Sequence, residues 1–247
     1  MTDAPLANRL AVVTGASRGI GRAAALALAG AGAHVVALAR TQGALEELDD
    51  EIRRAGGAAT LVPVDLKDYD ALDRLGAALH ERWGRLDILV ANAGLLGELA
   101  PLSHVDQGVW DAVMAVNVTA NWRLVRSLDP LLRASDAGRA IFLSSGAAHK
   151  CTAYWGPYSV SKAALEALAR TYANETLQTP VRVMMVNPGP LRTAMRRAAM
   201  PGEDPLTLRT PEELASHLVR LASPAWTETG KIYDFPTDRV LAPQMPG

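Results

Sequence analysis

The chain has 247 residues, of which 49% are hydrophobic, 5% aromatic and 21% charged. This length is typical of one α/β domain, and the apolar fraction is enough for a large core. The formal net charge of −1 gives no electrostatic reason to expect nucleic acid or an anionic membrane as a partner. With a single cysteine, Cys151, an intrachain disulfide is excluded. Residues 1–8 lack signal-peptide architecture and no apolar run could span a bilayer, so we expect a cytoplasmic protein.

Short apolar runs alternate with helical patterns along the chain. We expect strands at residues 10–13, 35–38, 60–64, 86–91, 140–144, 181–186 and 231–235, and helices at 20–31, 41–55, 69–83, 107–132 (broken or bent), 157–177 and 212–222. Uninterrupted apolar strands between helices are typical of a parallel sheet covered on both faces. The sequence therefore predicts a single α/β domain over residues 1–247, with a doubly wound parallel sheet of about seven strands flanked by helices. Residues 188–211 are expected to be a mobile substrate-binding segment and residues 242–247 a loose tail.

A glycine-rich turn joins the first strand to the first helix. It reads Thr14-Gly15-Ala16-Ser17-Arg18-Gly19-Ile20-Gly21. Glycines allow a tight turn and close approach of the backbone to a pyrophosphate, and a helix N-terminus supplies N–H groups and the positive end of a dipole. Glycines also mark purely structural turns, and the spacing is Gly-x-x-x-Gly-x-Gly rather than Gly-x-Gly-x-x-Gly. The position between strand and helix nevertheless favours a dinucleotide site.

The second strand ends at Arg40, where folds that prefer NAD commonly carry an acidic residue for the ribose 2′-hydroxyl. Arg18 lies in the glycine turn. Guanidinium groups suit a 2′-phosphate because they can form two parallel hydrogen bonds with it. We therefore expect a preference for NADP(H), with NAD(H) as the alternative if Arg40 only ends an exposed strand.

Tyr158 and Lys162 are four residues apart at the start of the helix expected at 157–177, so they share one helix face. A free phenol titrates near about 10 and is a poor base at neutral pH. A fixed positive charge nearby favours the phenolate, which makes the pair a candidate general acid/base. Tyr and Lys also meet at this spacing by chance, so the pair gains weight only from the other motifs.

Taken in order, these motifs resemble those of the short-chain dehydrogenase/reductase family, in its compact single-domain branch. The resemblance covers residues 9 to about 229. It rests on the glycine turn, Asp65, Asn92-Ala93-Gly94, Asn117, Ser144-Ser145, Tyr158 with Lys162, and Asn187-Pro188-Gly189 followed by Thr193. It implies a Rossmann-like fold and an NADP(H)-dependent oxidoreductase that transfers hydride between the nicotinamide and a small carbonyl or alcohol substrate.

The resemblance also implies catalytic roles. Tyr158 would exchange a proton with the substrate oxygen, and Lys162 would lower the pKa of Tyr158 and hydrogen-bond the nicotinamide ribose. Ser145, thirteen residues before Tyr158, would hold the substrate oxygen, with Ser144 as the alternative because adjacent strand residues face opposite ways. Asn117 would kink its helix and support a water leading protons to Lys162; the alternative is an ordinary buried asparagine.

Cofactor roles follow from the same resemblance. Asp65 would accept a hydrogen bond from the adenine amino group, unless it caps a helix. Asn92, Ala93 and Gly94 would line the cofactor at a strand end. The full implied set is Gly15, Ser17, Arg18, Gly19, Ile20, Gly21, Arg40, Asp65, Leu66, Asn92, Ala93, Gly94, Tyr158, Lys162, Pro188, Gly189 and Thr193. No metal site is expected.

Several questions stay open at this level. Neither the substrate nor the direction of the reaction can be read from the motifs. Pro236 interrupts the last strand region where many relatives carry an Asp-Gly-Gly-like turn at a subunit interface, so we expect a homodimer built on helices 107–132 and 157–177, with a tetramer as the alternative. We expect His149 to be a solvated loop residue, with an extra polar contact as the alternative, and Cys151 to be an inert packing residue rather than a reactive thiol. The cluster Arg192, Arg196 and Arg197 is expected to be a solvated helix face, with a site for an acidic substrate as the alternative. The alternative function is a non-catalytic NADP(H)-sensing regulator.

Overall fold

The computed structural model describes residues 4–243. A single eight-stranded sheet with strand order β3-β2-β1-β4-β5-β6-β7-β8 forms its centre. Neighbouring strands are parallel except β7 and β8, which are antiparallel. The strands are β1 (Leu10–Thr14), β2 (His34–Ala39), β3 (Ala58–Pro63), β4 (Ile88–Ala91), β5 (Arg139–Leu143), β6 (Arg182–Asn187), β7 (Lys231–Asp234) and β8 (Arg239–Leu241). The helices are α1 (Gly19–Gly30), α2 (Gln42–Arg54), α3 (Tyr69–Trp83), α4 (Gln107–Met114), α5 (Ala120–Ala134), α6 (Ala147–Lys150), α7 (Gly156–Glu175), α8 (Ala194–Ala199) and α9 (Pro211–Ala222).

The predicted fold class is confirmed, but the expectation of about seven strands is one too few. The extra strand, β8, has only three residues and lacks the apolar run from which a strand could be predicted. The chain reaches it through a 3₁₀ turn at Phe235–Thr237 that contains Pro236. Asp238 then adopts a left-handed conformation (φ 49°) and reverses the chain, so that β8 pairs antiparallel with β7.

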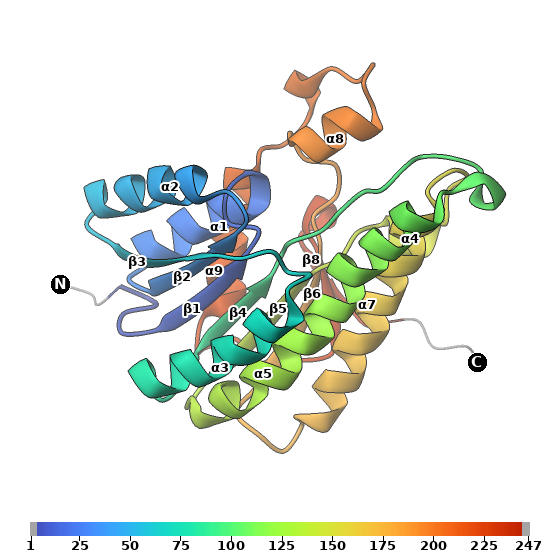
Figure 1. Cartoon of the computed structure of the whole chain (residues 1–247). Helices are drawn as coiled ribbons and strands as arrows, with labels where there is room; N and C mark the ends of the chain where they lie inside the picture. The colour runs from blue at the N-terminus through green and yellow to red at the C-terminus, as the bar shows by residue number, and fades with distance from the viewer. Residues whose placement is uncertain (1–3, 244–247) are drawn as a thin grey trace.

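Helices cover both faces of the sheet, as alternation along the strands requires. Ala11 and Val13 of β1 face the core beneath α1, α2 and α9, while Leu10 and Val12 face the core beneath α3, α5 and α7. Figure 1 shows these two groups of helices on opposite sides of the sheet. Each fully buried leucine of these cores contributes about 1.5–3 kcal/mol relative to an exposed one, so the two apolar layers are the main source of stability.

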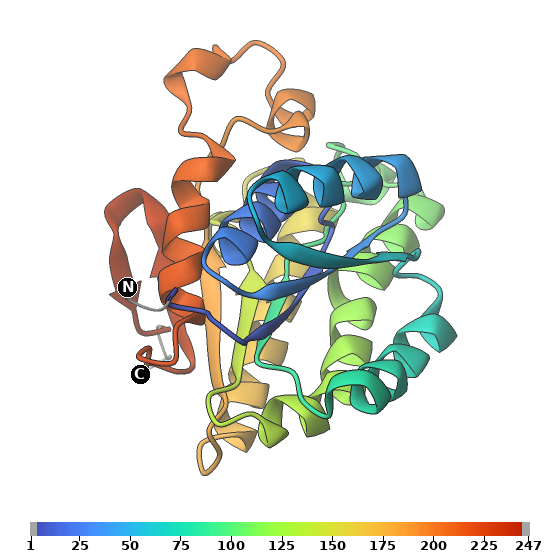
Figure 2. The ribbon, with the colours of Figure 1, turned by 90° about the vertical axis from the view of Figure 1, so that its left-hand side faces the viewer.

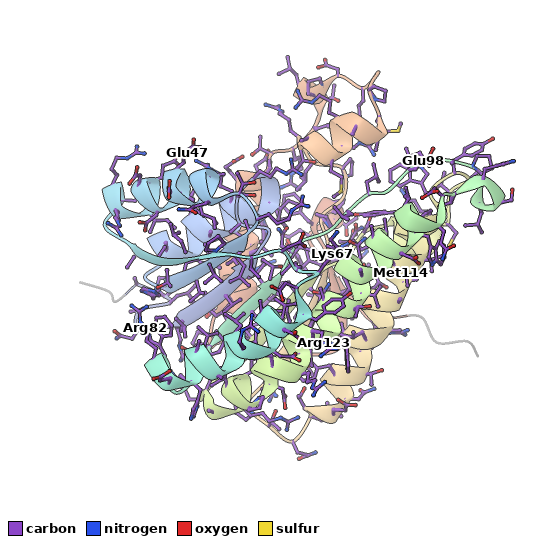
Figure 3. The ribbon with its side chains drawn as sticks, in the orientation of Figure 1. Glu47, Lys67, Arg82, Glu98, Met114 and Arg123 are labelled. Atoms are coloured by element: carbon purple, nitrogen blue, oxygen red, sulfur yellow. The ribbon has the colours of Figure 1, made fainter. Side chains whose placement is uncertain are left out.

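The helix expected at 107–132 is broken in the structure, as predicted. A π-helical turn, Ala115–Thr119, separates α4 from α5. Asn117 lies at its centre and is fully buried. Beyond the break, Arg123 on α5 donates to Asp73 on α3 (Nη1–Oδ2 2.7 Å), which ties these two helices together (Figure 3).

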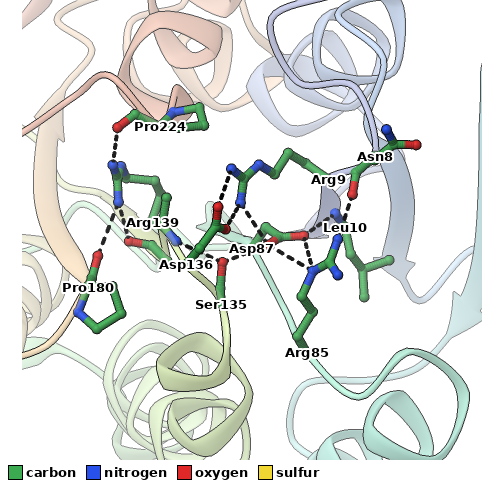
Figure 4. Close-up of polar contacts among 12 residues, drawn as sticks. Asn8, Arg9, Leu10, Arg85, Asp87, Ser135, Asp136, Arg139, Pro180 and Pro224 are labelled. Carbon is green, nitrogen blue, oxygen red and sulfur yellow. Dashed lines mark hydrogen bonds and ion pairs between the residues drawn. The ribbon is translucent and has the colours of Figure 1, made fainter.

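Buried ionic groups join the starts of the strands, at the edge opposite the glycine turn (Figure 4). Asp87, just before β4, is completely buried and accepts from Arg9 Nη1 (3.1 Å), the Leu10 backbone N–H (2.8 Å) and Ser135 Oγ (2.6 Å). Arg85 adds a further contact at 3.2 Å. One buried carboxylate thus connects β1, β4 and the segment that precedes β5, and its contacts satisfy the charge that burial would otherwise penalise.

Arg139, at the start of β5, is buried without an acidic partner among the described residues. Its guanidinium donates instead to the carbonyls of Gly138, Pro180, Ser223 and Pro224 (Figure 4). Burial lowers the pKa of Arg139 to about 10, so the group stays charged at neutral pH. The Arg139 side chain therefore links the three loops to which these carbonyls belong.

Residues 188–211 form an excursion that projects from the body in both Figure 1 and Figure 2. It carries α8 and a 3₁₀ turn at Pro205–Thr207. Its two ends are joined, since the Arg192 N–H donates to the Arg209 carbonyl (2.9 Å) and Leu191 pairs with Arg209. Its mobility stays a prediction. Most of the tail predicted to be loose at 242–247 lies outside the described residues. Within residues 4–243, no helix combines the length and apolarity needed to cross a bilayer.

Candidate active site

The glycine turn lies at the carboxyl end of β1, next to β4, where the strand order reverses. Ligands of open α/β sheets bind at such switch points. Gly15 and Gly19 have positive φ values of 66° and 56°. At Gly21 a Cβ would lie 2.2 Å from the Gly15 carbonyl oxygen, so no side chain fits there. Asn92 Nδ2 donates to the Thr14 carbonyl (2.9 Å) and fixes the turn from the next strand.

The turn fits an anionic group. Arg18 is the N-cap residue of α1, and its side chain makes no capping hydrogen bond. The N–H groups in the first turn of α1 therefore stay available to a bound anion. A cavity of about 180 Å³ beside it is lined by Ser17, Arg18, Arg40, Thr41 and Ala44. Both arginines are exposed, and neither forms an ion pair within residues 4–243. The cavity therefore carries positive charge that no neighbouring carboxylate of the described chain neutralises.

Asp65 follows β3 and does not cap a helix. Its Oδ1 accepts from the Lys67 N–H (2.9 Å) in a local turn, while Asp68 caps α3 by accepting from Ala71 (3.0 Å). The helix-cap alternative for Asp65 is therefore wrong. Leu66 is buried among core residues, so it could offer a cofactor only its backbone.

Tyr158 and Lys162 are both buried in the first turns of α7, which begins at Gly156 with Pro157 in its first turn. The Lys162 ammonium lies 5.6 Å from the centre of the Tyr158 ring and donates to the Leu143 carbonyl (2.6 Å). Burial lowers the pKa of Lys162 to about 8, and the negative charge of Glu166 opposes that fall. The pair predicted from its spacing is thus brought together in a desolvated site.

The pKa of Tyr158 is raised in this structure, whereas the resemblance implies that Lys162 lowers it. Burial raises the pKa of Tyr158, and a hydrogen bond from Ser145 lowers it only in part. Lys162 is not among the causes of this shift. The protein alone therefore keeps the phenol protonated, which is the form that donates a proton.

The two serines after β5 point to different partners. Ser145 lies beside the Tyr158 phenol, and its Oγ also accepts from the Ala147 N–H (3.2 Å). Ser144 is buried, and its hydroxyl donates to the carboxylate of Glu166. The geometry therefore favours Ser145 over Ser144 as the hydroxyl that faces a substrate.

Asn117 braces the segment after β4 against α7. Its Oδ1 accepts from the Leu95 N–H (2.7 Å), and its Nδ2 donates to the Leu95 carbonyl and to Ser161 Oγ, each at 2.9 Å. Its own carbonyl accepts from Asn121 (2.8 Å). A Cβ at Gly94 would lie 3.4 Å from Asn117 Oδ1 and 3.6 Å from Lys162 Nζ, so this segment passes close to the Lys162 ammonium. Protein groups satisfy the asparagine, and its part in a proton route stays a prediction.

The loop after β6 lies at the same carboxyl edge of the sheet and contacts the segments that follow β1 and β5. Asn187 Oδ1 accepts from the Gly146 N–H (2.8 Å) and the Gly189 N–H (3.2 Å). Thr193 caps α8 by accepting from Arg196, and a Cβ at Gly19 would lie 3.6 Å from its methyl group. The structure therefore brings Thr193 next to the glycine turn. Pro188 and Gly189 lie in the loop that leads to it, and their contact with a cofactor stays a prediction.

The arginine cluster in this excursion is engaged rather than free. Arg196 forms a two-point ion pair with Glu203 (2.6 Å), and Arg192 donates to the carbonyls of Pro205 and Leu208. These two side chains hold the excursion together. Cys151 is exposed and has a left-handed backbone (φ 45°).

Reasoning from the sequence missed Glu166, which is buried beneath the pair. It accepts from Ser144, and His149 Nε2 lies 2.9 Å from its Oε2, so His149 is not simply solvated. A signal was available, because Glu166 continues the four-residue spacing of Tyr158 and Lys162 on α7.

A larger cavity, of about 450 Å³, lies at the opposite edge of the sheet, near His34, Trp83 and Arg85. It brings together no pair of acid and base comparable to Tyr158 and Lys162. We therefore place the candidate active site at the carboxyl edge, where the glycine turn and that pair meet.

The chain is similar to known oxidoreductases along most of its length. A family model described as short chain dehydrogenase matches residues 9–204. The oxidoreductase YciK of Escherichia coli K12 is 37% identical over 93% of this chain and 92% of its own. A protein of Mycobacterium tuberculosis named as an NAD-dependent oxidoreductase is 39% identical over 77% of this chain and 74% of its own.

Among solved structures, a short chain dehydrogenase of Shigella flexneri complexed with NADP superposes with a TM-score of 0.90. It is 37% identical, and the match covers 94% of this chain and 99% of that one. The fold, the order of the motifs and these similarities all indicate the same family. The chain belongs to the short-chain dehydrogenase/reductase family of oxidoreductases.

Proposed function

We propose that the protein is an NADP(H)-dependent oxidoreductase that interconverts a carbonyl compound and the corresponding alcohol, with Tyr158 as general acid/base. The observation that carries this proposal is the buried Tyr158–Lys162 pair, with Ser145 beside it, at the same sheet edge as the glycine turn. NADP(H), when bound, supplies or accepts the hydride.

The side chains have complementary tasks in this proposal. Ser145 donates a hydrogen bond to the substrate oxygen and so holds it near the phenol. During reduction Tyr158 gives its proton to that oxygen, and during oxidation it takes the proton back. Lys162 supplies positive charge that stabilises the phenolate left behind. Asn117 is a positioning residue, because it fixes the strand end that covers the pair.

The preference for NADP(H) is supported by Arg18 and Arg40, which line the polar cavity beside the glycine turn. A 2′-phosphate in that cavity would meet two guanidinium groups. The Shigella relative was solved with NADP, whereas the Mycobacterium relative is named for NAD, so NAD(H) stays the alternative. A cytoplasmic location and a homodimer are also proposed, with a tetramer as the alternative.

The test is a turnover screen of the purified protein with NADPH and a panel of ketones, aldehydes and quinones, and with NADP⁺ and a panel of alcohols. We expect oxidation of NADPH that depends on at least one carbonyl compound, and formation of the corresponding alcohol. Tight NADPH binding without turnover on any member of the panel would favour a non-catalytic regulator. Low and even rates on many members would indicate a broad carbonyl reductase rather than a specific one.

A further inference from the structure

One face of α7 carries three ionisable groups in succession. Tyr158, Lys162 and Glu166 follow each other at four-residue intervals, and all three are buried. The proposed reaction uses the first two but gives no task to Glu166. A carboxylate whose side chain is only 7% exposed is costly unless opposite charge and hydrogen bonds compensate it.

Two side chains from outside α7 contact this carboxylate. Ser144, at the end of β5, donates to Oε1, and His149 on α6 approaches Oε2 with Nε2 at 2.9 Å. The His149 side chain is 60% exposed, so it forms the solvent side of the group. Each carboxylate oxygen of Glu166 therefore has a neighbour that fixes its position.

The other charged residues nearby are few. On α7, Lys162 precedes Glu166 by one turn and Arg170 follows it by one turn; on α6, Lys150 follows His149. Within the described residues none of these three cations approaches Glu166 to ion-pair distance, 4.0 Å or less. Lys162 differs from the other two because its side chain is buried, where charges interact over longer distances. The strands packed beneath α7 carry their charged residues, Arg139 and Arg182, at the opposite ends. Lys162 is thus the cation buried with Glu166 on this face.

We propose that Glu166 is a positioning residue whose carboxylate keeps Lys162 in its ammonium form, and that Ser144 and His149 hold the carboxylate for that task. Burial alone disfavours the ammonium, and its hydrogen-bond acceptor, the Leu143 carbonyl, is neutral. A negative charge on the same helix face is what opposes the loss of the proton. The relevance of this charge to catalysis rests on the proposed function; the protonation of Lys162 does not.

The direction of the effect follows from the sign of the charges. Burial lowers the pKa of Lys162 to about 8, and Glu166 acts to raise it. Without the carboxylate the ammonium would lose its proton at a still lower pH. Part of Lys162 would then be uncharged at neutral pH, which reduces the positive charge available to a developing phenolate.

The experiment is a pH titration of the lysine side chains by NMR of protein labelled with ¹³C at Cε. The chain has only four lysines, Lys67, Lys150, Lys162 and Lys231, and the Lys162→Met variant identifies the signal of Lys162 by its loss. We expect the titration midpoint of Lys162 to fall by about one pH unit in Glu166→Gln, an effect typical of losing one nearby opposite charge. Glu166→Met, which suits a buried site, provides the same test if the glutamine variant does not fold.

His149→Gln is the matched control, since it keeps an N–H donor but cannot become charged. The Glu166 carboxylate is still present in this variant, so the Lys162 midpoint should stay within about 0.3 units of the wild-type value. An unchanged midpoint in the Glu166 variants overturns the proposal, as does an equal fall in His149→Gln.

Activity gives a second readout that separates the two proposals. If Tyr158 is the acid, the alkaline limb of kcat/KM for carbonyl reduction should move to lower pH in Glu166→Gln, together with the Lys162 midpoint. A shift of the NMR midpoint without any turnover in the wild-type protein would leave the role of Glu166 intact and reject the proposed function.

Discussion

Arg40 lines the cavity beside the glycine turn, and in the proposed function it favours NADP(H) over NAD(H). Replacing it with aspartate removes a guanidinium from the cavity and adds a carboxylate that repels a 2′-phosphate but can accept from a ribose 2′-hydroxyl. We expect Arg40→Asp to weaken NADPH binding by about 10- to 100-fold, the scale of one lost charge-assisted hydrogen bond. Binding of NADH should be unchanged or tighter.

Fluorescence titration with both cofactors measures this change. Arg54→Asp, at the far end of α2, makes the same change of charge away from the cavity and should leave both affinities unchanged. The assignment fails if wild-type protein binds NADH as tightly as NADPH, or if the Arg54 variant loses NADPH affinity to the same extent.

Single residues also show where sequence reasoning stops. The spacing of Tyr158 and Lys162 could be read directly, because helix geometry puts residues four apart on one face. The contrary orientations of Ser144 and Ser145 follow from strand alternation, but only the packing of α7 shows which one meets the phenol. Glu166 escaped notice because an acidic residue four positions after a lysine is also the pattern of a solvated helix pair.

At the scale of elements, α1 contains two glycines, Gly21 and Gly30, whose replacement by alanine should have opposite effects on stability. At Gly21 a Cβ would meet the Gly15 carbonyl and Asn92, whereas at Gly30 a Cβ would meet nothing within 4 Å. Gly21→Ala should therefore displace the glycine turn, lower stability by about 1–3 kcal/mol and weaken NADPH binding at least tenfold. Gly30→Ala should raise stability by up to about 1 kcal/mol, because alanine favours the helix.

Urea unfolding and NADPH titration of both variants test this expectation. Normal NADPH affinity in a folded Gly21→Ala protein would show that close packing of the turn is not needed for the cofactor.

Element boundaries were predictable where the apolar pattern was long. Helices and parallel strands up to β7 appear close to their expected positions, since each must cover or extend a buried sheet. The break between α4 and α5 was foreseen, although only the hydrogen bonds of Asn117 explain its position. The short pieces β8, α6 and α8 were not predicted, because three to six residues carry no readable period.

At the scale of the whole molecule, the buried Asp87 network and the candidate active site lie at opposite edges of the sheet. Figure 4 shows the contacts through which Asp87 joins the strand starts. The glycine turn follows the other end of β1. Asp87→Asn removes the buried negative charge that accepts from Arg9, Ser135 and the Leu10 N–H, so we expect a loss of about 3 kcal/mol in the free energy of unfolding. NADPH affinity of the folded variant should not change.

Asp136→Asn is the matched control, because Asp136 also pairs with Arg9 but its side chain is 77% exposed. That variant should lose less than about 1 kcal/mol, as exposed pairs do. Equal losses in urea unfolding of the two variants would show that burial does not set the contribution of this network.

The assembly is also a property of the whole molecule. Trp122 on α5 and Val160 on α7 are large apolar side chains that stay 46% and 41% exposed in the single chain. If these helices form the proposed dimer, Trp122→Glu should shift the protein toward monomer in sedimentation velocity experiments. A wild-type monomer, or a dimer that is indifferent to this substitution, would contradict the proposed interface.

The central claim is that Tyr158 carries the proton in an NADP(H)-dependent reaction. The most direct measurement compares wild type with Tyr158→Phe, which removes only the phenolic oxygen, by NADPH titration and by turnover with the best substrate of the screen. We predict an NADPH affinity within about threefold of wild type and a loss of kcat of at least about 10²-fold, the lower end expected for a general acid. Turnover that survives this substitution would contradict the account.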